Sequence, residues 1–362
     1  MKNKIRTGII GCGKVSDLHA KAYALNEKSD FVAVYDRNME KAKLLAEKYH
    51  VKAYDSIQRM FNETGVEAVS ICTPHPNHKD SSIEAAEAGI HIAVEKPLAV
   101  SLKDCDSIIH AARKNNIIGT TISQRRFFKP SLRIKQAIDE GKIGKPILGT
   151  VEMLGWRDSA YYKSDPWRGT WNGEGGGVLV NQSPHQLDLL LWYMGEIDEL
   201  AGWWGNLNHP DIEVEDTAIA IIQFKNGALG NIVVSNSQNP GLFGKVHVHG
   251  SNGASIGVQT DSGSMFIAGM SKISDPPIND LWTIQGEEKM LPIWQKEDKD
   301  FFDQIDSTYY YHQCQINDFL NSILSDIPPL VTLEDGRKTV ELFTAIYRSK
   351  KDHSFEKFPL IY

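Results

Sequence analysis

The stretch IRTGIIGCGKVS, residues 5–16, decides how the first third of this chain folds. Its apolar half is typical of a buried β-strand, and it runs directly into Gly11 and Gly13. The residues that follow, from Leu18 to Leu25, carry apolar side chains at helical spacing. The order strand, glycine turn, helix predicts the opening unit of a parallel α/β sheet, with the turn at the N-terminus of a helix.

Strand and helix patterns keep alternating from this stretch to about residue 124. Connections of this length favour parallel strands with helices on both faces. We therefore expect an α/β fold class with an N-terminal Rossmann dinucleotide-binding domain at residues 1–124. The further strand patterns are Phe31–Tyr35, Ala68–Cys72, His91–Val94 and Ile117–Ile122, and the helical patterns are Asn38–Tyr49, Ser81–Ala88 and Asp104–Lys114.

The pattern changes after residue 124. Asn226-Gly227, between two β-rich stretches, is a strong signal for a hairpin with a type I′ turn. Hairpins pair strands antiparallel, so residues 125–362 are expected to form an α+β domain with a large, mostly antiparallel open sheet. Residues 257–300 have no clear periodicity. The β-rich stretches are Ile147–Trp156, Ala201–Asn206, Thr217–Phe224, Leu229–Ser235 and Lys245–Gly250, and helices are expected at Ser131–Glu140, Tyr309–Leu324 and Glu334–Lys350.

Composition narrows the classes of function. The 362 residues are 41% apolar and 23% charged, as is usual for a globular protein, and the formal net charge is -7. A mildly acidic chain is a poor partner for nucleic acid, and no apolar run approaches the roughly 18 residues that span a membrane. The four cysteines form no CxxC pair. We therefore expect no metal site, no disulfide framework and a reduced, cytoplasmic protein.

The glycine turn suits the pyrophosphate of a dinucleotide. Gly11 permits a tight turn, Gly13 lets the backbone approach the ligand, and the free N–H groups of the helix bind its charge. Ser16 stands at the third glycine position of the usual motif. Asp36, 23 residues after Gly13, ends the second strand and can accept bonds from ribose hydroxyls, which favours NAD over NADP. Arg37 could pair with a 2′-phosphate, so NADP stays open as the less favoured cofactor.

Other candidates for cofactor binding lie at the carboxyl ends of the predicted strands, where open α/β sheets bind ligands. The loop Thr73–His78 contains two prolines that stiffen it, and the alternative is a rigid loop with solvated histidines. The predicted cofactor-binding set is completed by Cys12, Lys14, Val15, Thr73, Pro74, His75, Asn77, His78, Glu95, Lys96 and Gln124.

The turn Glu95-Lys96-Pro97 places a lysine at the sheet edge that carries the glycine turn. Alcohol oxidation removes a hydride from carbon and a proton from oxygen. A nearby ammonium stabilises the negative charge that develops on that oxygen, and partial burial would let the lysine share the proton. Pro97 restricts the backbone beside it. Lys96 is therefore a candidate catalytic residue.

A second catalytic candidate, His185, lies in the other half of the chain. Ser183-Pro184 has the residue types of an N-cap and a first helical position, and the helix is expected to stop at Gly195. In the first turn, the helix dipole disfavours an imidazolium and leaves a ring that can act as a general base. Asp188 shares that side of the helix and could orient the ring or a substrate, although a purely structural carboxylate is as common there.

Together these pieces resemble the Gfo/Idh/MocA family, which includes glucose–fructose oxidoreductase and inositol dehydrogenase. The resemblance implies that Lys96 and His185 are the catalytic pair. Many relatives carry aspartate where this chain has Asn181, which can bind a sugar hydroxyl but cannot take a proton. This version resembles the branch that acts on sugars and nucleotide sugars. The matching pieces are Gly11-Cys-Gly13 with His19, Thr73-Pro74 with His78, Glu95-Lys96-Pro97, the run from Gly175 to Asp188, and Leu333-Glu-Asp-Gly336.

Aromatic and basic residues gather before that run, and they suit the apolar faces and hydroxyls of a sugar. A packed loop or subunit contact is the alternative for the aromatic residues, and a solvated basic turn is the alternative for Arg125. The predicted substrate-binding residues are Asn181, Asp188, Arg125, Trp156, Arg157, Trp167 and Arg168.

We therefore expect an NAD-dependent oxidoreductase that transfers hydride between nicotinamide and a secondary alcohol or ketone of a sugar, sugar derivative or cyclitol. Lys96 and His185 would have acid–base roles. The resemblance implies a homodimer or homotetramer, with a small-molecule substrate and no nucleic acid, membrane or metal ion. Two alternatives stay open: a dinucleotide-sensing regulator without turnover, and an NAD-dependent glycosidase of the same fold.

Overall fold

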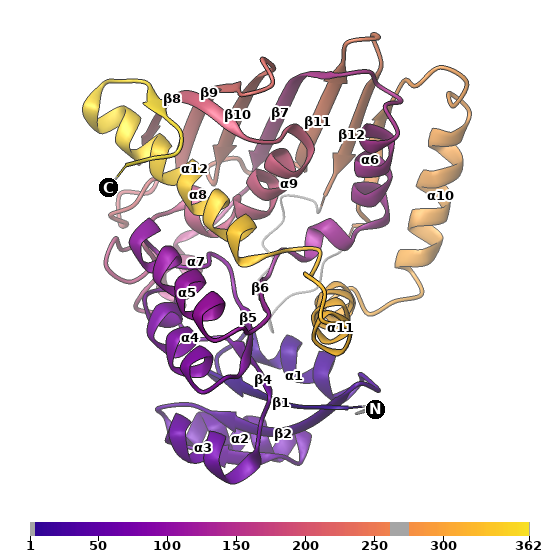
Figure 1. Ribbon diagram of the computed structural model, residues 1–362. Coiled ribbons are helices and arrows are strands. Elements are labelled where there is room, and N and C mark those ends of the chain that lie inside the picture. The colour runs from indigo at the N-terminus through magenta and orange to yellow at the C-terminus, as the bar shows by residue number, and fades with distance from the viewer. Residues whose placement is uncertain (1–3, 261–274, 362) are drawn as a thin grey trace. The chain divides into compact units, whose positions relative to one another are not determined.

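The computed structural model describes residues 4–260 and 275–361 (Figure 1). These residues group into two compact units. The first contains residues 4–124 and Ser307–Arg337, and the second contains residues 125–260, 275–306 and 338–361. Each unit has a sheet of its own.

The sheet of the first unit has six strands in the order β3-β2-β1-β4-β5-β6, and all neighbouring pairs are parallel. This is the strand order of the dinucleotide-binding Rossmann fold, which confirms the predicted fold class. The strands are β1 (Ile5–Ile10), β2 (Ser29–Tyr35), β3 (Lys52–Tyr54), β4 (Ala68–Ile71), β5 (His91–Val94) and β6 (Gly119–Thr121). The helices are α1 (Ser16–Ala24), α2 (Met39–Tyr49), α3 (Ile57–Thr64), α4 (His78–Glu87), α5 (Leu102–Lys114) and α11 (Tyr310–Ser325).

Side-chain caps begin several of these helices. Asn38, Ser56 and Ser101 each accept a backbone N–H from the first turn of α2, α3 and α5. Such a cap satisfies a donor that has no partner inside the helix. Gly65 ends α3 in the left-handed conformation, which glycine adopts without steric cost.

The apolar core of the first unit draws on both ends of the chain. Ile9 of β1, Tyr23 of α1 and Phe319 of α11 are wholly buried in one cluster. Figure 1 shows α11, in orange, packed beside the indigo and purple elements of this unit. A segment close to the C-terminus is therefore an integral part of the dinucleotide-binding fold.

The sheet of the second unit has eight strands in the order β13-β12-β11-β7-β10-β9-β8-β14. Only the pair β7 and β10 is parallel, so the predicted, mostly antiparallel sheet is confirmed. The strands are β7 (Pro146–Leu154), β8 (Ile197–Gly205), β9 (Thr217–Phe224), β10 (Leu229–Ser235), β11 (Gly244–Gly250), β12 (Ser255–Gln259), β13 (Ile278–Trp282) and β14 (Glu356–Lys357). The other helices are α6 (Lys129–Asp139), α7 (Ser159–Lys163), α8 (Val178–Asn181), α9 (Pro184–Met194), α10 (Met290–Phe302) and α12 (Leu333–Asp352).

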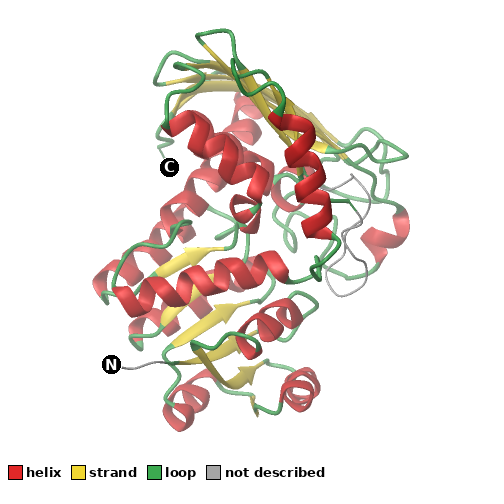
Figure 2. Cartoon of the chain, turned by 90° about the vertical axis from the view of Figure 1, so that its right-hand side faces the viewer, coloured by secondary structure: helices red, strands yellow, loops and turns green. Residues whose placement is uncertain are grey.

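This second sheet has one buried and one exposed face. Ala220 and Ile222 of β9 are buried, whereas Ile219 and Ile221 between and beside them are exposed. Figure 2 shows helices gathered on one side of these strands. Alternation of this kind is expected where only one face is covered, but the exposed positions here are apolar rather than polar.

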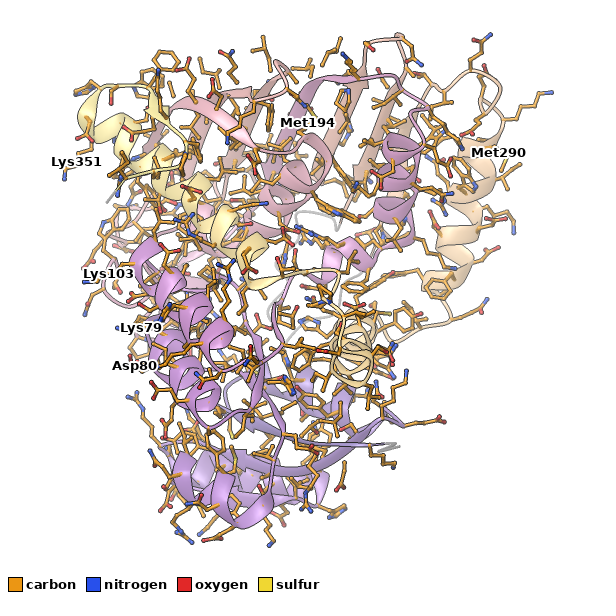
Figure 3. All side chains as sticks on the ribbon, viewed as in Figure 1. Lys79, Asp80, Lys103, Met194, Met290 and Lys351 are labelled. Atoms are coloured by element: carbon orange, nitrogen blue, oxygen red, sulfur yellow. The ribbon has the colours of Figure 1, made fainter. Side chains whose placement is uncertain are left out.

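Helix α9 packs closely on the buried face because β7 carries a glycine beneath it. A Cβ on Gly149 would lie 2.7 Å from Cγ of Met194, the last residue of α9, and 2.9 Å from Leu190. Figure 3 labels Met194 among the side chains of this unit. The helix ends at Gly195, whose φ is +88°, as the sequence predicts. The position of α9 matters because its first turn carries His185.

Strands β9 and β10 form the predicted hairpin, but the predicted turn type is wrong. A type I′ turn needs positive φ at both central residues, and only Gly227, at +85°, has it. The N–H of Gly227 donates to the carbonyl of Phe224 at 2.9 Å, and the N–H of Phe224 donates to Ala228 at 2.8 Å. This is the pattern of a three-residue loop with a glycine bulge, which the extra residue Lys225 imposes.

Several short elements have no periodicity that the sequence could reveal. Strand β3 has only three residues, and α8 is a run of four that contains three consecutive apolar residues. In the unassigned stretch 257–300, the structure has the end of β12, then β13 and α10, while residues 261–274 lie outside the described residues. No helix in the described ranges combines the length and apolar character needed to cross a bilayer.

Candidate active site

Gly11 holds a conformation that only glycine tolerates at this point. Its φ is +96°, and a Cβ would lie 2.7 Å from the carbonyl carbon of Cys72. Its N–H donates to the carbonyl of Tyr35 at 2.7 Å, which ties the turn to β2. Gly13 has nothing within 4 Å of the position that its Cβ would take. The backbone is therefore open to a pyrophosphate at Gly13, and the turn fits a dinucleotide.

Ser16 replaces the third glycine of the usual motif without disturbing the turn. It is buried in the first turn of α1, and its hydroxyl donates to the carbonyl of Gly13 at 2.6 Å. The small side chain leaves the start of the helix close to the sheet, and the bond adds rigidity to the turn.

Asp36 lies at the end of β2, beside the glycine turn, as predicted for a ribose-binding carboxylate. One carboxylate oxygen accepts the N–H of Cys12 at 2.8 Å, and the other accepts the N–H of Asn38 at 2.8 Å. Each oxygen still has a second lone pair for a ligand hydroxyl. Burial, and secondarily Asp36, raise the pKa of the Cys12 thiol to about 12, so the thiol stays neutral.

The Thr73–His78 loop is fastened to the lysine turn through a buried histidine. His78 is fully enclosed, with Nδ1 2.9 Å from the carbonyl oxygen of Pro97 and Nε2 2.9 Å from that of Thr73. Burial lowers the pKa of His78. Because both ring nitrogens face backbone carbonyls, His78 shapes the two loops rather than presenting its ring to a ligand.

Two residues among the predicted cofactor-binding residues have a buried side-chain oxygen with no hydrogen-bond partner within the described chain: Thr73 through Oγ1 and Gln124 through Oε1. Buried polar atoms are normally satisfied, so each calls for a partner from outside the protein. Both residues belong to the predicted cofactor set. Together with the open space at Gly13, they support the fit of a bound dinucleotide.

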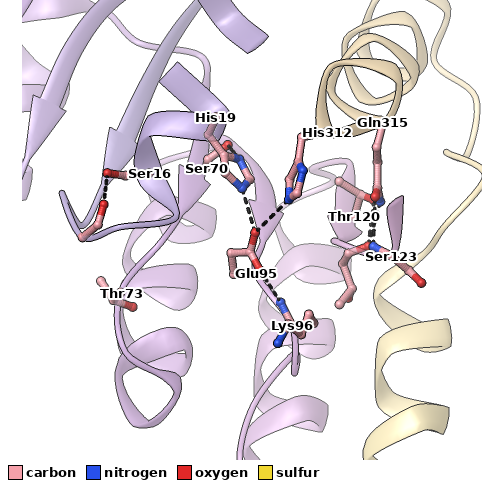
Figure 4. A network of polar contacts seen from close by, with 12 residues as sticks. Ser16, His19, Ser70, Thr73, Glu95, Lys96, Thr120, Ser123, His312 and Gln315 are labelled. Atoms are coloured by element: carbon pink, nitrogen blue, oxygen red, sulfur yellow. Dashed lines mark hydrogen bonds and ion pairs between the residues drawn. The ribbon is translucent and has the colours of Figure 1, made fainter. Parts of the chain in front are cut away.

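Glu95, next to Lys96, is the centre of a buried polar cluster (Figure 4). Its Oε1 lies 2.8 Å from Nε2 of His19 and 3.8 Å from Nε2 of His312, and its Oε2 accepts the N–H of Lys96 at 3.1 Å. Nδ1 of His19 lies 2.9 Å from the hydroxyl of Ser70. The sequence patterns did not reveal His312, because nothing in its own helix marks it as part of a site.

The buried cluster strongly shifts the pKa values of Glu95 and His312. Burial alone would raise the pKa of Glu95, but the hydrogen bond from His19 and the nearby positive charges lower it to about 2. Burial lowers the pKa of His312 to about 4. Glu95 is therefore an anion at neutral pH.

His19, Glu95 and His312 place three potential metal-ligand atoms within 4.8 Å of one another. The 2.8 Å between His19 and Glu95 is the length of a hydrogen bond. It is shorter than the roughly 3.3 Å that separates neighbouring ligands around tetrahedral zinc. The geometry is therefore that of a hydrogen-bonded cluster.

In the second unit, His185 lies where the sequence places it. Helix α9 begins at Pro184, directly after Ser183, so His185 is in its first turn, and the ring is mostly buried. Asp188, one turn later, forms a two-pronged ion pair with Arg126 at 2.8 and 2.7 Å, and both side chains are buried. Arg126, which the sequence offers beside Arg125 as an arginine for a ligand phosphate or carboxylate, instead binds Asp188, and its guanidinium stacks 5.1 Å from the ring of Trp192. Asp188 is therefore well placed to anchor α9.

The glycine run before α8 is held by a buried glutamate. Glu215 accepts the N–H of Gly177 at 2.9 Å and of Leu179 at 3.0 Å, and the hydroxyl of Tyr347 donates to it at 2.9 Å. A Cβ on Gly177 would lie only 1.8 Å from the Glu215 carbonyl oxygen. Burial raises the pKa of Glu215 to about 7, and the three donors limit that rise.

Asn181 joins a cluster of polar and aromatic residues. Its amide donates to the buried carboxylate of Glu174 and lies 3.1 Å from the hydroxyl of Tyr161. That hydroxyl also accepts from Arg168 at 2.6 Å and from Gln182 at 2.9 Å. Burial raises the pKa of Tyr161, so it remains a phenol.

The other predicted substrate residues divide into two sets. Arg157 and Arg168 both stack on Tyr161, at 5.4 and 4.4 Å, and Arg168 also covers Trp167 at 4.5 Å. Trp156 forms an isolated bridge to Ser237. Arg157, Arg168 and Trp167 therefore form one local cluster with Asn181 around Tyr161. Trp156 adjoins this cluster, because its carbonyl accepts from Nη1 of Arg157 at 2.6 Å. Arg125 instead lies 3.5 Å from the hydroxyl of Thr260, at the beginning of the second unit.

Two family models match the chain. One, described as the oxidoreductase family with an NAD-binding Rossmann fold, matches residues 5–122. The other, described as the GFO/IDH/MocA C-terminal domain, matches residues 131–256.

Curated proteins of known name also match. The chain is 30% identical to the myo-inositol 2-dehydrogenase of Thermotoga maritima over 264 residues, which cover 69% of this chain and 74% of that protein. It is 28% identical to the scyllo-inositol 2-dehydrogenase (NAD(+)) of Bacillus subtilis over 262 residues, 70% of this chain and 74% of that protein.

Among solved structures, the chain resembles the WlbA dehydrogenase from Bordetella pertussis in complex with NADH and UDP-GlcNAcA. The TM-score is 0.87 with 26% identity, and the match covers 100% of this chain and 99% of that one. These similarities confirm the predicted fold class and NAD as the cofactor.

Proposed function

The chain belongs to the GFO/IDH/MocA family of NAD-binding oxidoreductases, and we propose that its substrate is a sugar, a sugar derivative or a cyclitol. The reacting group is a secondary alcohol or the corresponding ketone. The observation that carries the proposal is the dinucleotide turn, open at Gly13, in a chain whose other unit presents a buried histidine at the start of α9. The named relatives act on inositols, and one structural relative holds a nucleotide sugar.

A nucleotide sugar is the first substrate class to test. A solved structure that matches the whole length of this chain, that of the WlbA dehydrogenase from Bordetella pertussis, holds UDP-GlcNAcA. The cluster around Tyr161 offers arginines for negative charge and aromatic rings for the apolar face of a sugar. Within the described chain, the buried Nε of Arg157 and Oδ1 of Asn236 have no partner, which supports a ligand at this cluster.

The bound nicotinamide supplies the hydride acceptor or donor. In the direction of oxidation, His185 takes the hydroxyl proton and Lys96 stabilises the negative charge on the same oxygen. The helix dipole at the first turn of α9 favours a neutral ring on His185, which a base requires. Asn181 cannot move a proton, and we assign it to substrate binding.

Loss of either catalytic candidate should slow turnover. We expect Lys96→Ala and His185→Ala each to reduce kcat by at least about 100-fold, as for loss of a general acid or base. The measurement is NAD reduction with a panel of nucleotide sugars, uronates, free sugars and inositols, and NAD affinity is measured by fluorescence titration.

Exposed residues of the same type serve as matched controls. Lys103→Ala and His353→Ala remove an exposed lysine and an exposed histidine, and we expect wild-type turnover. Wild-type rates in Lys96→Ala or His185→Ala would overturn the assigned roles. A failure of every carbohydrate in the panel to reduce NAD would overturn the proposed substrate class.

We also propose that the chain forms a homodimer or homotetramer through the exposed face of the second sheet. Neighbouring strands there expose Ile219 and Ile221 of β9, Leu229 and Val233 of β10, and Trp203 of β8. A contiguous apolar patch on a sheet face is typical of an interface between protein chains. A second copy of the chain offers a surface of the same character, as isologous contacts require.

A further inference from the structure

We propose that His19 and His312 are positioning residues that act through the Glu95 carboxylate on Lys96. Glu95 makes three contacts through its two oxygens: Oε1 faces both imidazoles, and Oε2 accepts the backbone N–H of Lys96. This inference rests on the proposed role of Lys96. It adds that the aim and charge of Lys96 depend on a residue more than 200 positions later in the chain.

The geometry fixes the Glu95 side chain from several sides. Its backbone N–H donates to the carbonyl of Ile71 at 3.1 Å, so the turn begins in register with β4. His19 is itself held by Ser70, whose hydroxyl lies 2.8 Å from that of Tyr23. The carboxylate can therefore change rotamer only if this buried chain of bonds breaks.

Helix α11 braces the ends of two neighbouring strands. Gln315 lies three residues after His312, so the two side chains share one face of the helix. The Gln315 amide accepts the N–H of Ser123 at 2.9 Å and donates to the carbonyl of Thr121 at 2.8 Å (Figure 4). His312 faces the turn after β5, and Gln315 holds the segment after β6.

Charge gives the network a second effect. The titratable groups that interact electrostatically with Glu95 are His19 from α1, Cys72 directly after β4, His78 from α4, His312 from α11 and the neighbouring Lys96. Burial raises the pKa of Tyr23 and Cys72, which stay neutral. A fixed anion at Glu95 favours the ammonium form of Lys96, which is the form that stabilises an alkoxide.

The charge effect is measured directly by the rate at which Lys96 is acetylated, followed by mass spectrometry. Acetylation consumes the amine form, so Glu95→Gln should speed the labelling of Lys96 at neutral pH by about threefold or more. Lys103 in the same sample should label at an unchanged rate. This readout needs no substrate and is independent of turnover.

The positioning effect is measured by a pair of His312 variants. His312→Phe keeps the ring volume but removes both nitrogens, and we expect kcat to fall about tenfold while NAD affinity stays within about twofold. His312→Gln restores a polar group near the position of Nε2, which lies 3.8 Å from Glu95 Oε1, and should return kcat to within about twofold of the wild type. Circular dichroism and melting temperature check that both variants fold.

Each result has a defined meaning. An unchanged labelling rate in Glu95→Gln would overturn the charge effect, and equal impairment of His312→Phe and His312→Gln would reduce His312 to a packing residue. Wild-type turnover in the Lys96→Ala variant would instead contradict the proposed catalytic role of Lys96. The labelling experiment would then still report whether Glu95 controls Lys96.

Discussion

At the scale of single residues, the buried carboxylate of Glu174 explains why asparagine, rather than aspartate, suits position 181. Its amide donates to the carboxylate of Glu174, which is itself almost wholly buried and also binds the N–H of Gly169 at 2.6 Å. An aspartate at position 181 would place two carboxylates against each other in a site with little water. Like charges so close cannot both remain ionised without a large cost.

This pairing predicts the effect of restoring the aspartate that many relatives carry. Asn181→Asp should lower the free energy of unfolding by roughly 1–3 kcal/mol near pH 7, because a buried donor is replaced by a like charge. The double variant Asn181→Asp/Glu174→Gln restores one donor and one acceptor and should regain most of that loss. Urea denaturation of the four proteins in the cycle measures the coupling, and strictly additive effects would contradict it.

At the scale of elements, the start of α8 depends on Glu215. The carboxylate of Glu215 accepts the backbone N–H groups of Gly177 and Leu179, and Gly177 has no room for a side chain. Gly177 is thus required by close packing against Glu215 rather than by flexibility. The segment carries Asn181 and leads into α9, so its anchoring also sets the position of His185.

Glu215 should make folding stability depend on pH. Its pKa is raised to about 7 in the fold, chiefly by burial, and is near 4.5 when unfolded. Its contribution is therefore complete below about pH 4.5 and is lost as the pH rises to about 7. A pKa difference of about 2.5 corresponds to about 3 kcal/mol.

The check is the difference between the wild type and Glu215→Gln. We expect the free energy of unfolding of the wild type to fall more steeply between pH 5 and 7.5 than that of the variant, by up to about 3 kcal/mol. Other titrating groups are common to both proteins and cancel. Parallel curves would show that the carboxylate does not titrate in this range.

The elements also show how far sequence reasoning reaches. Long periodic segments such as α2 and β9 were predictable to within a residue, because their burial patterns follow one period. The ends of α9 were predictable from Pro184 and Gly195, but Ser183 does not cap the helix, because its hydroxyl donates to the carbonyl of Leu179 instead. The type of the Asn226-Gly227 turn was not predictable, because the dipeptide alone does not show how many residues the loop contains. One additional loop residue selects a different type of hairpin.

At the scale of the whole molecule, what the sequence could not provide is long-range pairing. Glu95 was quoted for its place in a turn, but its partner His312 lies on a helix whose own pattern only predicts burial. Arg126 likewise has no local signal that it will meet Asp188. Local periodicity reveals elements, whereas contacts between distant elements depend on the topology that the elements adopt.

Oligomer formation is a property of the whole molecule, and substitution of a single surface residue can test it. Ile221 is 57% exposed at the centre of the apolar sheet face, and Ile221→Glu should shift the mass measured by light scattering from an oligomer toward the monomer. Leu44→Glu, at a leucine that is 70% exposed on α2, is the matched control and should leave the mass unchanged. A wild type that is already monomeric at micromolar concentration would contradict the proposed interface.

The fate of one hydrogen atom tests the central claim most directly. A carbohydrate that reduces NAD is labelled with deuterium at its reacting carbinol carbon. The labelled carbohydrate is incubated with the enzyme and NAD, and the reduced cofactor is then analysed by mass spectrometry. The account predicts deuterium in the reduced cofactor with the wild type, formed at least about 100 times more slowly with Lys96→Ala and with His185→Ala. Reduced cofactor without deuterium, or with equal rates in all three proteins, would contradict it.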